Sequence, residues 1–136
     1  MREHGLAAAA DRVIDLIYTH DFQRDRPDAV EEFRSMLTAY EVEDILGKLH
    51  ATAAFDHTTH LTQLEISVLV IAGEHDGVFP SAHSEHLAAT IPHAELVVFR
   101  DSGHQPHVDA PAAFNEVLRG FLADHPCSRF SNEGRR

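Results

Sequence analysis

The sequence predicts an α/β protein in which a helical segment precedes a strand–helix–strand–helix unit with parallel strands. Two runs of consecutive apolar residues, at 68–72 and 96–99, carry this prediction. Apolar residues that follow one another, instead of alternating with polar ones, indicate strands buried on both faces, as in parallel sheets. A helix-like segment at 81–89 separates the two runs. Strand, helix and strand within about thirty residues are typical of a right-handed crossover unit.

Helical periodicity dominates the chain before the first strand. Apolar residues recur at the spacing of one helix face over residues 6–18, from Pro27 to Tyr40 and over residues 42–53. Pro27 suits the first turn of the second helix because its φ is fixed at a helical value. Core packing explains these apolar faces better than a direct chemical role, so we expect packed helices with residues such as Leu46 facing inward.

One further helix is expected after the second strand, beginning near Pro111, and a connector at 55–65 joins the front helices to the first strand. A sheet of only two parallel strands has too few hydrogen bonds between its strands, and too little surface covered by other elements, to be stable by itself. Either strands from elsewhere complete the sheet, or the front helices fold back over its open edge.

Size and composition are those of one globular domain with one hydrophobic core. Of the 136 residues 43% are hydrophobic, and no apolar stretch approaches the roughly 18 residues of a membrane span. The N-terminus lacks the basic-then-apolar order of a signal peptide, so a cytoplasmic location is expected. Acidic residues outnumber basic ones 22 to 11, which disfavours nucleic acid and anionic membranes as partners. The single cysteine, Cys127, excludes an internal disulfide and a cysteine-based metal cluster.

Twelve histidines are many for a chain of this length. His83 and His86 stand three residues apart, as do His57 and His60, and this spacing shares a helix face and could hold zinc. No third potential metal ligand stands at a sequence spacing from either pair that would indicate a zinc site. We therefore interpret them as surface histidines and expect no metal.

A carboxylate and an imidazole follow the two predicted strands. Asp76 stands in a turn just past the first strand, and His104 stands just past the second. Because neighbouring parallel strands end at the same edge of a sheet, the carboxylate can meet the imidazole there and hold it in the tautomer needed for base catalysis. Each residue alone also fits an ordinary turn. Their joint occurrence favours the catalytic interpretation.

Two segments resemble the α/β-hydrolase fold family. Residues 68–80, an apolar run followed by Gly, two residues, Asp and then Pro, resemble the acid-bearing strand and turn of that family. Residues 102–111, with Gly-His followed by an acid and a Pro, resemble its histidine loop. The resemblance covers about residues 66–122. The front helices are similar to the family's cap, closest in character to the enol-lactonase, esterase and cofactor-free haloperoxidase branch.

The resemblance implies that Asp76 is the acid and His104 the histidine of a catalytic triad. It also implies a nucleophile in a G-x-S-x-G turn upstream of the cap, with an oxyanion hole further upstream. The sequence contains no such turn. We therefore expect residues 1–65 to be a cap-like segment, residues 66–124 the C-terminal part of an incomplete α/β-hydrolase fold, and residues 125–136 a flexible tail.

No residue of this sequence is expected to replace the missing nucleophile. Ser102 is two positions from His104 on the same loop, where the backbone direction disfavours an approach of its hydroxyl to the imidazole. Cys127 has no neighbouring base in the sequence. An aspartate nucleophile, as in dehalogenase-like members of the family, stays open because the nucleophile turn is not in the sequence.

The function implied by the resemblance is hydrolysis of a carboxylic ester or lactone by a serine hydrolase. His104 would take the proton of a nucleophile outside this sequence, and Asp76 would stabilise the imidazolium. The expected partner is a small acyl substrate, and no cofactor is expected. The cap residues expected to line its pocket are Phe33, Met36, Tyr40 and Phe55.

A non-catalytic chain is the alternative. It would be an inactive remnant of such an enzyme, or an association module whose open sheet edge pairs with a second copy or with a complementing chain. A histidine-rich metal binder is a third and weaker hypothesis.

Overall fold

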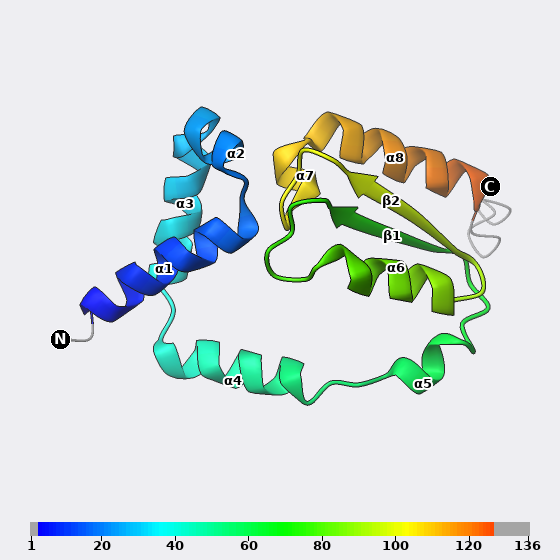
Figure 1. Cartoon of the computed structure of the whole chain (residues 1–136), viewed down its shortest axis with the longest axis horizontal. Coiled ribbons are helices and arrows are strands. Elements are labelled where there is room, and N and C mark those ends of the chain that lie inside the picture. Colours follow the sequence, from blue (N-terminus) through cyan, green and yellow to red (C-terminus); the bar gives the residue numbers. More distant parts are fainter. Residues whose placement is uncertain (1–2, 127–136) are drawn as a thin grey trace, which may run out of the picture.

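The computed structural model describes residues 3–126, so most of the tail predicted at 125–136, Cys127 included, lies outside the described residues. None of the described helices combines the length and the apolar character needed to cross a bilayer. Figure 1 shows α1 to α3 at the left, α4 and α5 along the bottom, and the two strands at the right. The elements are α1 (Glu3–Ile17), α2 (His20–Asp25), α3 (Pro27–Thr38), α4 (Val42–Ala53), α5 (Thr58–Leu61), β1 (Val68–Gly73), α6 (Ser81–Thr90), β2 (Ala94–Phe99), α7 (Pro106–Asp109) and α8 (Pro111–Asp124).

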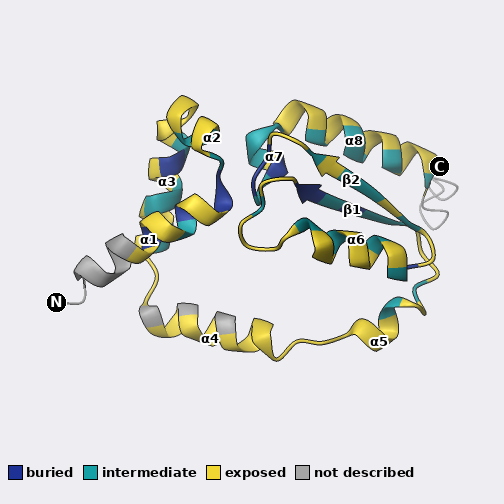
Figure 2. Cartoon of the chain, in the orientation of Figure 1, coloured by how far each residue is buried: buried dark blue, intermediate teal, exposed yellow. Residues whose placement is uncertain are grey.

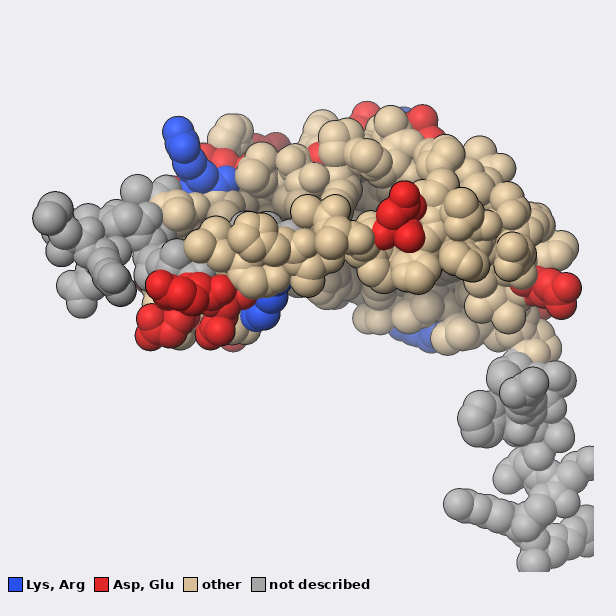
Figure 3. Space-filling model, turned by 90° about the horizontal axis from the view of Figure 1, so that it is seen from below, with Lys and Arg blue, Asp and Glu red and all other residues tan. Residues whose placement is uncertain are grey.

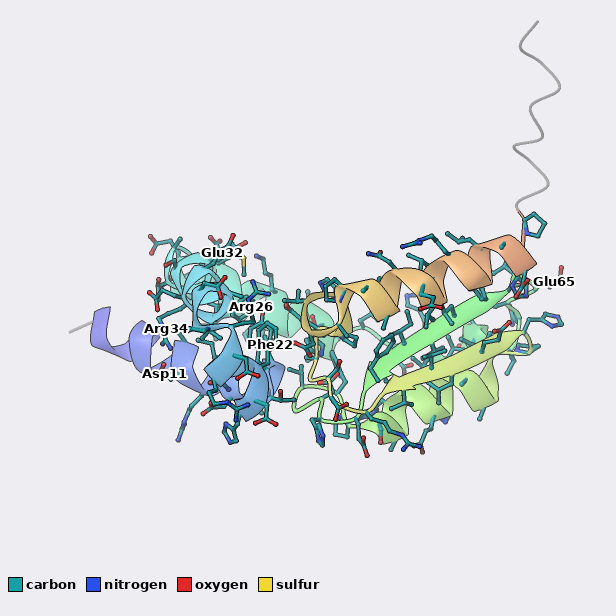
Figure 4. The ribbon with its side chains drawn as sticks, turned by 90° about the horizontal axis from the view of Figure 1, so that it is seen from above. Asp11, Phe22, Arg26, Glu32, Arg34 and Glu65 are labelled. Carbon is teal, nitrogen blue, oxygen red and sulfur yellow. The ribbon has the colours of Figure 1, made fainter. Side chains whose placement is uncertain are left out.

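The two strands form a parallel sheet, as predicted. Its register runs from Val68 opposite Ala94 to Gly73 opposite Phe99. The helices α6 and α8 lie on opposite sides of the strands in Figure 1 and again in Figure 4. The predicted α/β class, with a helical segment before a strand–helix–strand–helix unit, is therefore confirmed.

The sheet is buried unevenly (Figure 2). Val70 and Ala72 of β1 are buried, whereas Val98 of β2 is 39% exposed. The consecutive apolar residues at 96–99 predicted burial on both faces. With only two strands among the described residues, the flanking helices leave part of the second strand uncovered, so its apolar side chains keep some contact with solvent.

The helices α1, α2 and α3 pack into a helical unit around a small core, and Val108 of α7 packs against the same core. An ion pair between Arg34 of α3 and Asp11 of α1 joins two of these helices at the surface (Figure 4). Partly buried residues, among them Phe22 and Phe33, pack around the core. The buried core side chains are Ile14, Ile17, Tyr18 and Val30.

Two front helices differ from the sequence prediction. The short helix α2 forms between the helices predicted at 6–18 and from Pro27, where no helix was predicted. The side chain of Thr19 accepts a hydrogen bond from the N–H of Phe22 at 3.2 Å and caps it. The helix α4 forms as predicted but runs along the outside (Figure 1), and Leu46 is 48% exposed instead of facing inward. Amphipathic periodicity predicts an apolar face but not whether a neighbour covers it. The side chains of Val42, Ile45 and Leu49 lie outside those that the structure describes.

Three backbone segments meet where the two strands end. A Cβ atom on Gly73 would lie 1.8 Å from the carbonyl oxygen of Gly103, and one on Gly103 would lie 2.1 Å from the carbonyl oxygen of Ile17. Only residues without a side chain allow so close an approach. The same approach lets the N–H of His104 donate a hydrogen bond to the carbonyl of Ile17 at 2.7 Å. We call this contact of Gly73, Gly103 and Ile17 the glycine junction.

Replacing Gly73 with alanine should destabilise the fold by about 3 kcal/mol, because the new methyl group collides with backbone atoms that cannot move aside alone. The matched control is Gly120→Ala in α8, where an added Cβ meets nothing within 4 Å. That variant should be about 0.5–1 kcal/mol more stable, since alanine is the better helix former. Urea unfolding followed by circular dichroism measures both changes. Similar small effects at the two positions would contradict the tight packing of the junction.

Candidate active site

Asp76 and His104 lie side by side at the carboxyl ends of the two strands. The Nδ1 atom of His104 is 2.8 Å from Oδ2 of Asp76, within hydrogen-bonding distance. Asp76 belongs to the turn after β1, and His104 belongs to the loop between β2 and α7. A carboxylate at Nδ1 favours the tautomer that carries its proton there, which leaves Nε2 free to accept a proton.

The second carboxylate oxygen of Asp76 organises its own turn. Oδ1 accepts hydrogen bonds from the N–H groups of Val78 and Phe79, at 2.8 and 2.9 Å. The geometry therefore fits both interpretations of this residue, because one oxygen caps the turn while the other meets the imidazole. Since the turn fixes the carboxylate, Oδ2 binds the ring with little further loss of side-chain entropy.

An open cavity of about 660 Å³ adjoins the pair. Asp76 and His104 both line it, and the ring of Phe79 stands 5.7 Å from the imidazole. Its walls come from α5, the end of β1, the following turn and α6. Within the described part of the chain, neither Lys nor Arg lines this cavity. The large apolar side chains of the lining are Leu61, Ile71, Val78, Phe79 and Leu87.

Comparison with known proteins identifies the family. The family model for the alpha/beta hydrolase fold matches residues 2–111. The chain belongs to the α/β-hydrolase fold family.

Curated relatives match this α/β-hydrolase chain over most of its length. RutD of Pseudomonas syringae, a presumed carbamate hydrolase, is 31% identical over 98 residues, which are 72% of this chain and 38% of that protein. The 3-oxoadipate enol-lactonase 2 of Acinetobacter baylyi is 31% identical over 122 residues, which are 90% of this chain and 45% of that protein. The chain thus spans less than half the length of these two relatives.

Solved structures agree with the sequence matches. The enol-lactonase of Burkholderia xenovorans superimposes with a TM-score of 0.82 at 26% identity, covering 90% of this chain and 46% of that one. An esterase of Thermogutta terrifontis gives a TM-score of 0.79 at 28% identity, covering 91% of this chain and 46% of that one. The predicted resemblance to the enol-lactonase and esterase branch of the α/β-hydrolase fold is confirmed.

The four residues predicted to line a substrate pocket lie away from the cavity. Phe33 packs inside the helical unit, edge-on to Tyr18 with 5.5 Å between ring centroids. Phe55 is 72% exposed, and Met36 and Tyr40 are exposed as well. Periodicity places such residues on an apolar helix face, but it does not say which face meets a cavity.

The apolar residues that do line the cavity were missed by the sequence analysis. Val78 and Phe79 directly follow the acid turn, so their adjacency to Asp76 was an available signal. Leu61 belongs to α5, inside the segment that the sequence predicted as a connector. Nothing local to Leu61 indicates that its side chain lines a cavity together with Ile71 of β1 and Leu87 of α6.

The histidine pairs lie in two different environments. His57 and His60 are exposed, with 5.5 Å between ring centroids, whereas His83 and His86 lie on α6 and line the cavity. Across residues 3–126, no group of three or more His, Cys, Asp or Glu side chains is arranged so that it could hold a metal ion.

A partly buried carboxylate supports the histidine loop. Oδ2 of Asp109 accepts a hydrogen bond from the N–H of Gly103 at 2.7 Å, next to His104 in the chain. Its Oδ1 is buried and has no hydrogen-bond partner among the described residues. Burial raises the pKa of Asp109, although the hydrogen bond from Gly103 and the nearby His107 oppose this shift.

Replacing Asp109 with asparagine should stabilise the fold more at about pH 7 than at about pH 4. Because burial raises its pKa in the folded state above the unfolded value, the folded chain binds the proton more tightly. The stability that this proton contributes is lost as the pH rises from the unfolded pKa through the folded one. Asparagine has no charge to desolvate and keeps an oxygen for Gly103.

Urea unfolding at the two pH values measures the effect of Asp109→Asn, with the exposed Asp101→Asn as control. An equal gain at both pH values would show that burial of the charge is not its cause.

Proposed function

We propose that this chain contributes the acid, Asp76, and the histidine, His104, to an active site that hydrolyses a carboxylic ester, a lactone or a related acyl compound. The observation that carries the proposal is the 2.8 Å distance between Nδ1 and Oδ2 at the shared edge of two parallel strands. Membership of the α/β-hydrolase fold family supports it, as do relatives named for lactone and carbamate hydrolysis.

His104 acts as the general base in this proposal. With the Nδ1 proton donated to Asp76, the lone pair on Nε2 takes the proton of an attacking hydroxyl. The positive charge that then forms on the ring is stabilised by the Asp76 carboxylate, which the N–H groups of Val78 and Phe79 hold in place. The ring returns the proton to the departing oxygen or nitrogen as the bond to the acyl carbon breaks.

The nucleophile comes from polypeptide outside this sequence. Ser102 is only 2% exposed, and among the described residues no hydrogen bond joins its hydroxyl to the ring of His104. Ser84 lines the cavity, but among the described residues no hydrogen bond joins it to His104. In the proposed arrangement residues 1–65 form a cap, residues 66–124 form the C-terminal part of the core, and the remaining polypeptide supplies the nucleophile and the oxyanion hole.

The cavity favours an uncharged substrate. Its large apolar side chains suit a hydrocarbon or ring portion. Neither Lys nor Arg of the described chain lines it, so it offers no partner for a substrate carboxylate, and the carboxylate of Asp76 would repel one. Figure 3 views the side that carries α4, α5 and α6, where the middle of the surface holds few charges and acidic side chains gather toward the N-terminal end.

Acyl transfer to an added alcohol should depend on His104. The purified chain, given a short p-nitrophenyl ester and a small alcohol as nucleophile, should release p-nitrophenol about tenfold faster than the His104→Ala variant. This is less than the roughly hundredfold or more of a fully positioned base, because nothing orients the added alcohol. The release rate is followed by absorbance.

The exposed His107 provides the matched control for this assay. Imidazole itself reacts with activated esters, so the twelve histidines produce a background, and His107→Ala should lower the rate only by its share of that background. Equal rates in the chain and both variants would contradict a catalytic role for His104. An in-frame G-x-S-x-G turn in the DNA upstream of Met1 would independently identify the source of the nucleophile.

Within residues 3–126 no strand pairs with the outer edge of β1, which favours a second candidate function, association with another polypeptide. The N–H groups of Val68 and Glu74 donate to the carbonyls of His93 and Phe99, on the side of β2. Alternate residues of a strand direct their backbone groups to opposite sides, so those of Leu69 and the other odd-numbered residues of β1 face the open edge. Such an edge can pair with a strand of a second copy or of a complementing chain.

Proline substitution along β1 should separate edge pairing from folding. Leu69→Pro removes an N–H at the open edge and should give a folded monomer. For the unsubstituted chain, sedimentation velocity should give an apparent mass that increases with protein concentration. Val70→Pro removes a donor to β2 and should prevent folding, and Leu69→Ala controls for the lost side chain. A monomeric chain whose unfolding does not depend on concentration would contradict this second function.

A further inference from the structure

His104 lies in a loop without regular structure. Residues 100–105 connect the end of β2 to α7, and neither helix nor strand includes them. The hydrogen bond to Asp76 fixes one ring nitrogen, but the direction of the other depends on the backbone on either side of the residue. A side chain in such a loop keeps one direction only if contacts from outside hold that backbone.

Other parts of the chain hold three consecutive residues of this loop. The N–H of Gly103 is bound by the partly buried carboxylate described above, and the N–H of His104 donates to the carbonyl of Ile17 at 2.7 Å. The amide oxygen of Gln105 accepts a hydrogen bond from the hydroxyl of Tyr18 at 2.8 Å. The last two contacts come from neighbouring residues at the end of α1, and Tyr18 is separated from Gln105 by 87 positions.

Tyr18 is well placed to be a rigid hydrogen-bond donor. It is 5% exposed, its ring stacks on Phe22 with 4.7 Å between centroids, and it meets Phe33 edge-on at 5.5 Å. Figure 4 labels Phe22, which lies on the side of the helical unit toward the strands. Burial raises the pKa of the Tyr18 hydroxyl, and the nearby carboxylate of Asp109 adds to the shift. The hydroxyl therefore keeps the proton that it donates.

The same helix end also contacts the acid turn. The N–H of Gly77 donates to the carbonyl of Leu16 at 3.0 Å. Leu16, Ile17 and Tyr18 therefore contact the loops on both sides of the acid–histidine pair. Packing of the helical unit needs only the ring of Tyr18, because phenylalanine would fill the same space among the other aromatic rings. The hydroxyl makes its hydrogen bond outside this core, to the histidine loop.

We propose that Tyr18 is a positioning residue for His104: its hydroxyl fixes Gln105 and thereby the direction in which the imidazole faces the cavity. The role of His104 as a base rests on the proposed function, whereas the effect of Tyr18 on the loop does not. The helical unit is then more than a cover for the site, because its packing determines the geometry of the reactive ring.

The Tyr18→Phe variant tests this inference, because it removes the hydroxyl and keeps the ring. Hydrogen exchange measured by NMR on the whole chain should show the N–H groups of Gly103 and His104 exchanging about fivefold faster, the effect of losing one ordinary hydrogen bond. The imidazole proton shared with Asp76 should also exchange faster. The N–H groups of β1 should change by less than about twofold.

Tyr40→Phe is the matched control, because Tyr40 is exposed and is the second of the two tyrosines in the chain. It should leave the loop unchanged. Unchanged exchange at the loop in Tyr18→Phe would overturn the proposal. An equal rise at every amide would also overturn it, because that result is expected if Tyr18 only stabilises the fold.

Gln105→Leu removes the acceptor of the same hydrogen bond. It provides an independent test of the proposal if the Tyr18→Phe variant does not fold. It should reproduce the faster exchange of the loop, and the double variant should show no further increase. Additive effects of the two substitutions would contradict the proposal that both act through the hydrogen bond between Tyr18 and Gln105. Because hydrogen exchange needs no turnover, an inactive chain in the ester assay would reject the proposed function without deciding the role of Tyr18.

Discussion

The close approach of backbone at Gly73, Gly103 and Ile17 determines where the side chains of Asp76 and His104 lie. Gly73 ends the first strand and Gly103 directly precedes His104, so their contact brings the acid turn and the histidine loop within one hydrogen bond of each other. A side chain at either glycine would collide with this backbone, so the loops could not approach as closely. The end of α1 closes the contact from the other side, which makes the helical unit part of the site.

Polar contacts add to apolar packing in holding the loops that follow the strands. On the apolar side, Val108 of α7 packs against the core of the helical unit, and Pro106 at the start of α7 is buried. A single neutral hydrogen bond contributes only about 1 kcal/mol, so one such contact would leave the loop mobile. Several of them together, to Ile17, Tyr18 and Asp109, can restrict it to one geometry. The carboxylate of Asp109 opposes folding when it is charged, and it stands where it binds the residue before His104.

The parts of the structure that follow from local pattern could be predicted from the sequence. Consecutive apolar residues indicated the strands, and the turn residues after them indicated that Asp76 and His104 share one edge. Contacts between distant segments could not be predicted in this way. The helical periodicity of α4 placed Leu46 on an apolar face, but it could not indicate whether another element covers that face. For Phe33, the same kind of pattern fitted contact with a cavity as well as contact with another helix. The contact of Tyr18 with Gln105 joins residues 87 positions apart, and no local signal marks it.

The geometry of the acid–histidine pair is determined within this chain. The hydrogen bonds that orient Asp76 come from its own turn, and those that hold the histidine loop come from α1 and α7. All of these hydrogen bonds join residues in the part of the chain that the structure describes. A nucleophile supplied by other polypeptide would therefore meet an imidazole that is already oriented, and binding energy would not be spent on ordering it. What such polypeptide would add to the fold is cover for the open edge of β1, where backbone groups now lack strand partners among the described residues. Completion of the sheet and completion of the active site would then be the same event.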